Sequence, residues 1–118
     1  MRNRVWLVTG ASRGIGAEIA KAVLATGDTL IAAARTPSTL AFLGSSDRLL
    51  PVRLDVTDSA QAADAVAAGI ERFGQIDILV NNAGISFLGA VEETSADHVK
   101  RLFETNVFGL LNVTRAVL

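Results

Sequence analysis

The fold of this chain follows from residues 5–24, which read VWLVTGASRGIGAEIAKAVL. The apolar run Val5–Val8 is typical of a buried strand. A glycine-rich turn comes next, and apolar residues then recur at helical spacing from Ile15 to Leu24. The sequence therefore predicts a strand, a turn and a helix over Gly16–Thr26.

The turn between this strand and this helix is suited to a phosphate group. Unpaired backbone N–H groups and the positive end of the helix dipole point outward at the start of a helix. Glycine has no Cβ, so it lets a phosphate approach closely, and it adopts positive φ readily. We therefore expect a pyrophosphate at residues 9–16; the alternative is an ordinary turn whose glycines serve only the backbone.

Strands and helices continue to alternate along the chain. Further strands are expected at Thr29–Ala34, Leu49–Leu54 and Asp77–Val80, and further helices from Thr57 or Asp58 to about Phe73 and from Thr94 or Ser95 to the last residue. The first of these two helices is expected to face inward at Ala63, Val66, Ala67, Ile70 and Phe73. Strands without polar alternation are typical of sheets covered on both faces. The sequence predicts a doubly wound parallel α/β sheet of Rossmann type, forming one domain, or part of one, over residues 1–118.

Composition narrows the possible functions. The 118 residues are 50% hydrophobic and carry a formal net charge of −1, so no basic field points to nucleic acid or an anionic membrane. The chain has no cysteine and one histidine, which excludes disulfides and thiolate ligands and gives no reason to expect a metal. No signal-peptide core and no run of about 18 apolar residues occurs. Cytoplasm is the expected location.

Three motifs, each after a predicted strand, carry a family resemblance. They are Thr9-Gly10-x-x-x-Gly14-Ile15-Gly16, Asp55-Val56 and Asn81-Asn82-Ala83-Gly84. Together they resemble the N-terminal portion of the short-chain dehydrogenase/reductase family, from Val5 to Leu118. The carboxyl ends of parallel strands meet in one crevice, so the motifs are expected to share a dinucleotide site.

The resemblance implies a role for each motif. Pyrophosphate and the adjacent ribose are expected at Gly10, Ala11, Ser12, Arg13, Gly14, Ile15 and Gly16. Asp55 and the Val56 backbone are expected to read the adenine, and Asn82, Ala83 and Gly84 to line the ribose side. Two structural alternatives stay open: a helix-capping turn at residues 55–58, and a turn at 81–84 that ties strand to strand. The resemblance implies that both roles coexist at 81–84, with Asn81 as the structural member and Asn82 as the cofactor neighbour.

The residues after the second predicted strand indicate the cofactor. A site that prefers NAD usually has a carboxylate there, bonded to the ribose 2′-OH. This strand instead ends at Ala34 and continues with Arg35. Guanidinium groups of Arg35 and Arg13 suit a 2′-phosphate, so NADP(H) is predicted over NAD(H). The alternative is that Arg35 is a solvated loop charge.

The last predicted helix contains one polar residue on its apolar stripe, Asn106. A buried amide without a partner costs about 1–3 kcal/mol, so Asn106 is expected to be hydrogen-bonded. The resemblance implies that it is a catalytic residue that kinks the helix and holds a proton-relay water through its backbone carbonyl. Gly109 is consistent with a local break. The alternative is an asparagine that only ties helix to sheet.

The family resemblance also implies a catalytic serine, tyrosine and lysine. These 118 residues contain no tyrosine, and we expect the chain to be truncated after the fourth strand and the following helix. Two functions are therefore carried forward. One is the NADP(H)-binding part of an oxidoreductase that acts on a small carbonyl or alcohol, inactive by itself and homo-oligomeric when complete. The other is a non-catalytic dinucleotide-binding module or pseudoenzyme.

Truncation is expected to expose apolar surface. Ile78–Val80 would form an unpaired sheet edge, and Phe108 and Leu111 would lack cover. The isolated chain is therefore expected to aggregate, to self-associate, or to depend on further residues.

Overall fold

The computed structural model describes residues 3–84 and 94–118. Its strands are β1 (Val5–Val8), β2 (Thr29–Ala34), β3 (Leu49–Arg53) and β4 (Ile78–Val80). Its helices are α1 (Gly14–Ala25), the 3-10 helix η1 (Pro37–Leu43), α2 (Ser59–Phe73), α3 (Ala96–Phe103), the π-helix η3 (Glu104–Gly109) and α4 (Leu110–Val117). The alternation of strands and helices matches the sequence prediction. The loop expected over residues 81–93 is described only for 81–84.

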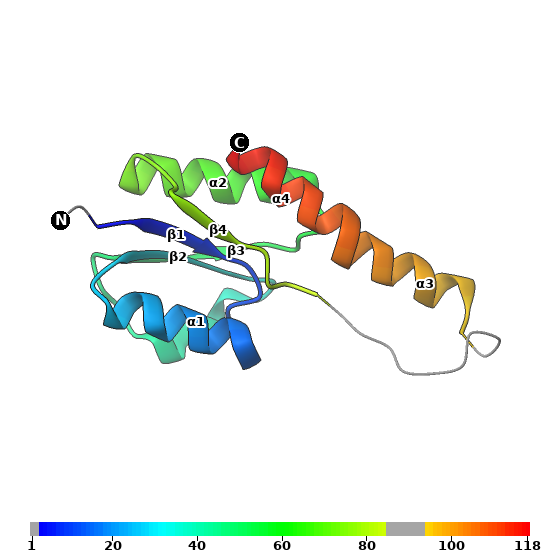
Figure 1. The fold of residues 1–118 in the computed structure, drawn as a ribbon, viewed down its shortest axis with the longest axis horizontal. Helices are drawn as coiled ribbons and strands as arrows, with labels where there is room; N and C mark the ends of the chain where they lie inside the picture. Colours follow the sequence, from blue (N-terminus) through cyan, green and yellow to red (C-terminus); the bar gives the residue numbers. More distant parts are fainter. Residues whose placement is uncertain (1–2, 85–93) are drawn as a thin grey trace.

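The four strands form one parallel sheet in the order β3-β2-β1-β4. Helices α1 and η1 cover one face and α2 and α4 cover the other, which confirms the doubly wound α/β architecture (Figure 1). A hydrophobic core lies on each face of the sheet, and alternate strand residues point into one or the other. Leu7 and Ile31 pack toward α2 and α4, whereas Val8 and Leu30 pack toward α1. The strands are apolar throughout because both faces are buried.

Pro51 lies in β3, an edge strand of the described sheet. An edge position tolerates proline because its missing N–H removes no bond to a further strand. β4 forms the other edge of the described sheet.

Two helices differ in part from the prediction. α1 begins at Gly14 and not at Gly16, and its Ile15 is 74% exposed. In α2, Val66 and Phe73 pack inward as expected, but Ala63, Ala67 and Ile70 are exposed, and Ala62, Ala65 and Gly69 are buried. A Cβ on Gly69 would collide with the Ile31 side chain, so α2 turns its small residues toward the sheet and approaches closely.

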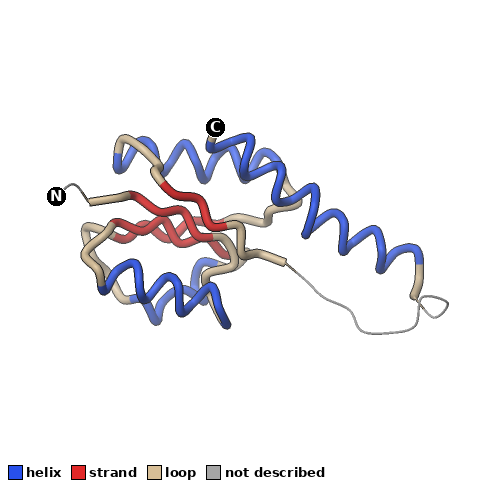
Figure 2. The backbone as a smooth tube through the Cα atoms, viewed as in Figure 1, coloured by secondary structure: helices blue, strands red, loops and turns tan. Residues whose placement is uncertain are grey.

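The C-terminal helix is interrupted. The π-helix η3 separates α3 from α4, which confirms the expected local break, and α3 extends past the end of the sheet (Figure 2). Val113 is fully buried, but Phe103, Phe108 and Leu111 are exposed. The Asn106 side chain is also exposed, so the expectation of a buried amide was wrong. No helix among the described residues is long and apolar enough to cross a membrane.

Candidate functional site

A cleft of about 380 Å³ lies at the carboxyl ends of the strands. It brings together residues from the turns after all four strands, as the sequence predicted for an open parallel sheet. Its lining consists of Gly10, Ser12, Arg13, Gly14, Ala34, Arg35, Leu54, Asp55, Val56, Asn82, Ala83, Gly84 and Thr105. Four predicted site residues do not line it: Ala11 and Gly16 are buried beneath it, Ile15 is exposed, and Asn106 lies beside Gly84.

The glycines of the first loop have different physical roles. Gly10 has φ +62°, and a Cβ there would lie 3.0 Å from the Ala83 Cα. A Cβ on Gly16 would overlap the Gly10 carbonyl oxygen and the Asn82 Nδ2. Gly14 has φ +58° but meets nothing within 4 Å on its Cβ side. Gly10 and Gly16 therefore allow the chain to pack on itself, whereas Gly14 leaves open space at the start of α1.

The N-terminus of α1 retains its capacity to bind an anion. Its N-cap residue, Arg13, has an extended backbone, and no side-chain hydrogen bond caps the helix there. By contrast, Asp58 caps α2 by accepting from the backbone N–H groups of Ala60 and Gln61. Backbone donors at the start of α1 can therefore bind a phosphate oxygen at the floor of the cleft.

Thr9 joins the first loop to the loop after β4, a role that the sequence analysis did not assign. Its side chain is buried, and its Oγ1 accepts hydrogen bonds from the backbone N–H groups of Asn82 and Ala83, each 3.0 Å long. The same hydroxyl donates to the Val80 carbonyl at 3.4 Å. The one sequence feature that could have indicated this role is a hydroxyl group directly after the apolar strand β1.

Asn81 and Asn82 make different contacts. Asn81 Nδ2 donates to the Thr114 Oγ1 at 3.1 Å, which ties the turn after β4 to α4. Asn82 lines the cleft, but its Nδ2 also donates to the Gly10 carbonyl at 3.0 Å. Asn82 therefore has a structural contact as well as a place at the site.

Asp55 is held in a turn and also faces the cleft. Its Oδ1 accepts from the Thr57 hydroxyl at 2.7 Å and from the Thr57 N–H at 3.0 Å. The Thr57 hydroxyl is the main cause of a lowered Asp55 pKa; burial opposes it, and the Thr57 N–H and the Arg35 charge add to the lowering. Asp55 is therefore a carboxylate at neutral pH with Arg35 nearby.

Two arginines approach the cleft from different elements. Arg13 comes from the glycine loop and Arg35 from the turn after β2, and both are exposed. The last residue of β2 is Ala34, so within the described chain β2 ends without a carboxylate. Two cationic side chains therefore line the cleft together with the Asp55 carboxylate.

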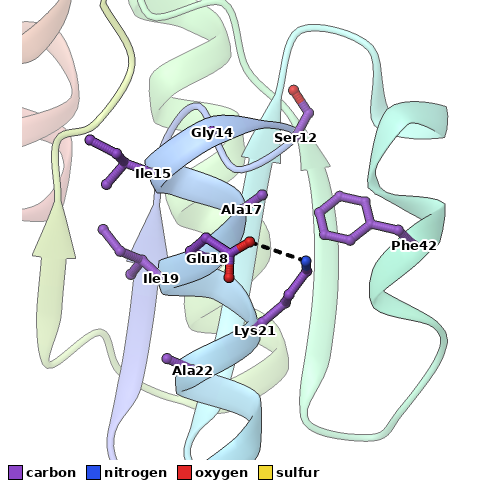
Figure 3. Close-up of a pocket in the computed structure, with 9 residues that line it drawn as sticks. All are labelled: Ser12, Gly14, Ile15, Ala17, Glu18, Ile19, Lys21, Ala22 and Phe42. Atoms are coloured by element: carbon purple, nitrogen blue, oxygen red, sulfur yellow. Dashed lines mark hydrogen bonds and ion pairs between the residues drawn. The ribbon is translucent and has the colours of Figure 1, made fainter.

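A second groove runs along the outer face of α1 and was not predicted (Figure 3). It is wide, about 880 Å³, and is lined mainly by apolar side chains such as Ile15, Ile19 and Phe42. Its cation, Lys21, lies 3.3 Å from the Glu18 carboxylate and 5.7 Å from the centre of the Phe42 ring. Because this cation is neutralised locally, the groove is poorly suited to an anion, and the cleft is the stronger candidate site.

Comparison with known proteins places these features in a family. Residues 4–118 match the family model described as short chain dehydrogenase. The chain is 44% identical over 118 residues to "Oxidoreductase BOA17" of Botryotinia fuckeliana, covering 98% of this chain and 43% of that protein. A solved short-chain dehydrogenase from Streptomyces avermitilis superimposes with a TM-score of 0.93 at 46% identity, covering 98% of this chain and 43% of that one.

Two further solved structures contain cofactors. A 3-ketoacyl-(acyl-carrier-protein) reductase from Brucella melitensis, complexed with NADH, has a TM-score of 0.92 at 31% identity over 98% of this chain and 49% of its own. An alcohol dehydrogenase from Thermococcus sibiricus, complexed with 5-hydroxy-NADP, has a TM-score of 0.91 at 30% identity. The match covers 98% of this chain and 52% of that one. The chain thus spans about half the length of these relatives.

Proposed function

The chain belongs to the short-chain dehydrogenase/reductase family, and from this we propose that residues 1–118 form the NADP(H)-binding part of an oxidoreductase acting on a small carbonyl or alcohol substrate. The observation that carries the proposal is the convergence of three segments on one cleft. These segments follow β1, β3 and β4, and they contribute Gly14, Asp55 and Asn82 to its lining.

The residues present fit a dinucleotide. Uncapped N–H groups at the start of α1, beside the open space at Gly14, suit the pyrophosphate. Asp55 and the Val56 backbone recognise the adenine, and Asn82, Ala83 and Gly84 flank the ribose. When bound, the nicotinamide supplies or accepts the hydride; the chain's own residues bind and orient the cofactor.

Preference for NADP(H) over NAD(H) is supported by Arg13 and Arg35. Both line the cleft, and β2 ends at Ala34, where a carboxylate would repel a 2′-phosphate. Planar guanidinium groups donate paired hydrogen bonds to phosphate oxygens. Because solved relatives carry either NADH or an NADP derivative, the choice rests on these residues of this chain.

Asn106 is proposed as the catalytic residue within this part of the protein. It lies in η3, and a Cβ on Gly84 would be 3.1 Å from its Oδ1, so it stands next to the cleft. A π-helix interrupts the regular i→i−4 ladder, which makes such segments frequent at functional sites. The Asn106 backbone carbonyl would hold the water of a proton relay.

We propose further that the whole protein acts on a small carbonyl or alcohol and assembles as a homo-oligomer. Exposed Phe103, Val107 and Phe108 support further packing partners for the C-terminal helix. A cytoplasmic location is proposed with it.

Titration of the purified protein with NADPH and NADH tests the function. We expect the fluorescence of both reduced cofactors to change on binding, with NADPH bound at least about tenfold more tightly, as one additional charged hydrogen bond allows. Equal affinity would overturn the NADP(H) preference. Absence of binding by either cofactor would overturn the dinucleotide site itself. Binding without turnover of any carbonyl or alcohol in the full-length protein would favour the non-catalytic module.

A further inference from the structure

α4 holds the turn after β3 through one side chain, that of Asn112. Its Nδ2 donates a 3.0 Å hydrogen bond to the carbonyl oxygen of Val56. Val56 is buried and lines the cleft, whereas Asn112 does not line it. Asn112 therefore lies outside the candidate site but forms a hydrogen bond with one of its lining residues.

The other backbone groups of this turn have partners close in sequence. The Asp55 N–H donates to the Gln61 Oε1 at 2.8 Å, and the Thr57 N–H donates to the Asp55 Oδ1 at 3.0 Å. The Asp58 N–H donates to the Asp55 carbonyl. The bond from Asn112 to Val56 spans 56 residues and ties this turn to α4.

Val56 is also where η3 packs. Gly109 is the buried residue of η3, and a Cβ there would lie 2.6 Å from the Val56 Cγ2. Asn106 occupies the same short π-helix, next to Gly84. A displacement of Val56 relative to α4 would therefore shift the segment that carries Asn106.

We propose that Asn112 is a positioning residue that fixes the Val56 peptide at the cleft and, through the contact of Val56 with Gly109, the segment η3 that contains Asn106. The inference rests on the proposed dinucleotide site and deepens it. Through Asn112, the geometry that reads the adenine and the geometry that presents Asn106 depend on one hydrogen bond. Loss of that bond disturbs both.

The Asn112→Asp variant tests the hydrogen bond itself. Its carboxylate has nearly the shape of the amide but cannot donate to the Val56 carbonyl, whereas the protonated carboxyl group can. We expect adenosine 2′,5′-bisphosphate, measured by calorimetry, to bind about tenfold more weakly than to the native protein at pH 7.5. The carbonyl oxygen that it faces disfavours the ionised form of the new carboxyl group, so the affinity relative to the native protein should recover as the pH is lowered from 7.5 toward the usual aspartate pKa of about 4. Asn112→Leu, without a donor at any pH, should stay weak.

Thr114→Val is the matched control, because it removes another polar anchor of α4 and leaves Asn112 in place. Its affinity relative to the native protein should not change with pH. A purely space-filling role for Asn112 would give parallel pH profiles for the Asp and Leu variants, and that result would overturn the proposal. Native affinity in both variants would overturn it as well.

Hydrogen exchange without nucleotide separates this inference from the proposed function. Asn112→Leu should speed the exchange of amides in residues 55–58 and in 104–109 together, whereas Thr114→Val should spare 55–58. Unchanged exchange in either segment of the Leu variant would contradict the coupling. If the native protein failed to bind the bisphosphate, the proposed NADP(H) preference would be wrong, yet exchange would still decide whether Asn112 positions both segments.

Discussion

The side-chain amide of Asn82 donates a 3.0 Å hydrogen bond to the carbonyl oxygen of Gly10, so the loops after β1 and β4 are joined at the cleft. The two loops are 72 residues apart in sequence. Gly16 lies directly against this bond, since a Cβ there would overlap both the acceptor oxygen and the Asn82 Nδ2. The glycine loop is thus shaped by packing between protein segments before any ligand binds.

Gly16→Ala should destabilise the protein and impair nucleotide binding. The added methyl group must displace backbone at Gly10, and overpacking of this kind costs about 1–3 kcal/mol. Urea denaturation measures the loss, and NADPH titration measures binding. Gly44→Ala is the control, because Gly44 has φ +76° and open space around it. That variant should lose stability through backbone strain and bind NADPH normally; equal binding by both variants would contradict the role given to Gly16.

Thr9→Val should leave the Ala83 N–H without its partner and the Asn82 N–H with only the Val80 carbonyl, 3.1 Å away. The valine fills the same volume but cannot accept from the N–H groups of Asn82 and Ala83. We expect a loss of about 1–3 kcal/mol in the free energy of unfolding. Thr9→Ser keeps the hydroxyl and should retain more stability and more NADPH affinity than the valine variant. A valine variant as stable as the native protein would show that the hydroxyl is dispensable.

The strand positions could be predicted from sequence because strands buried on both faces are continuous apolar runs. Thr29–Ala34 was located without error. The strand-end motifs followed from topology, which gathers Asp55 and Asn82 at one edge. These inferences need only local pattern and the general geometry of parallel sheets.

Features that depend on close contact between distant segments were missed. The inward face of α2 was misassigned in part, because Gly69, which carries no hydrophobic signal, packs on Ile31, whereas Val66 and Phe73 were assigned correctly. Asn106 was expected to be buried from the helical stripe, but α3 and η3 extend past the sheet and leave it exposed. The partners of Thr9 and Asn112 lie 56 or more residues away, beyond the reach of spacing arguments.

Trp6 should report the protonation of Asp28. Its Nε1 donates to the Asp28 Oδ2 at 2.9 Å, and this bond is the main cause of a lowered Asp28 pKa, with the Arg4 backbone N–H adding to it. A lowered pKa in the folded state means that the stabilisation is present above the usual aspartate value of about 4 and is lost as pH falls through the folded value. Emission of Trp6, the single tryptophan, should therefore change below about pH 4.

Asp28→Asn should abolish that transition, whereas Asp47→Asn, at an exposed aspartate, should preserve it. Circular dichroism recorded at each pH distinguishes local titration from acid unfolding. An unchanged emission curve in the Asp28 variant would assign the transition to another group.

Arg35→Ala should weaken NADPH binding selectively. Arg35 lines the cleft beside Asp55, and a hydrogen-bonded charge pair with a 2′-phosphate is worth about 1.5–3 kcal/mol, so we expect a loss of about 10- to 100-fold in NADPH affinity. NADH has a hydroxyl in place of that phosphate, and its affinity should change little.

Arg13→Ala should act in the same direction, because the Arg13 guanidinium approaches the cleft from the glycine loop. Arg53→Ala removes an exposed arginine at the end of β3 that does not line the cleft, so it controls for net charge. If the Arg35 and Arg53 variants lose NADPH affinity equally, the effect is general electrostatics, and Arg35 is a solvated loop charge without a specific role in cofactor choice.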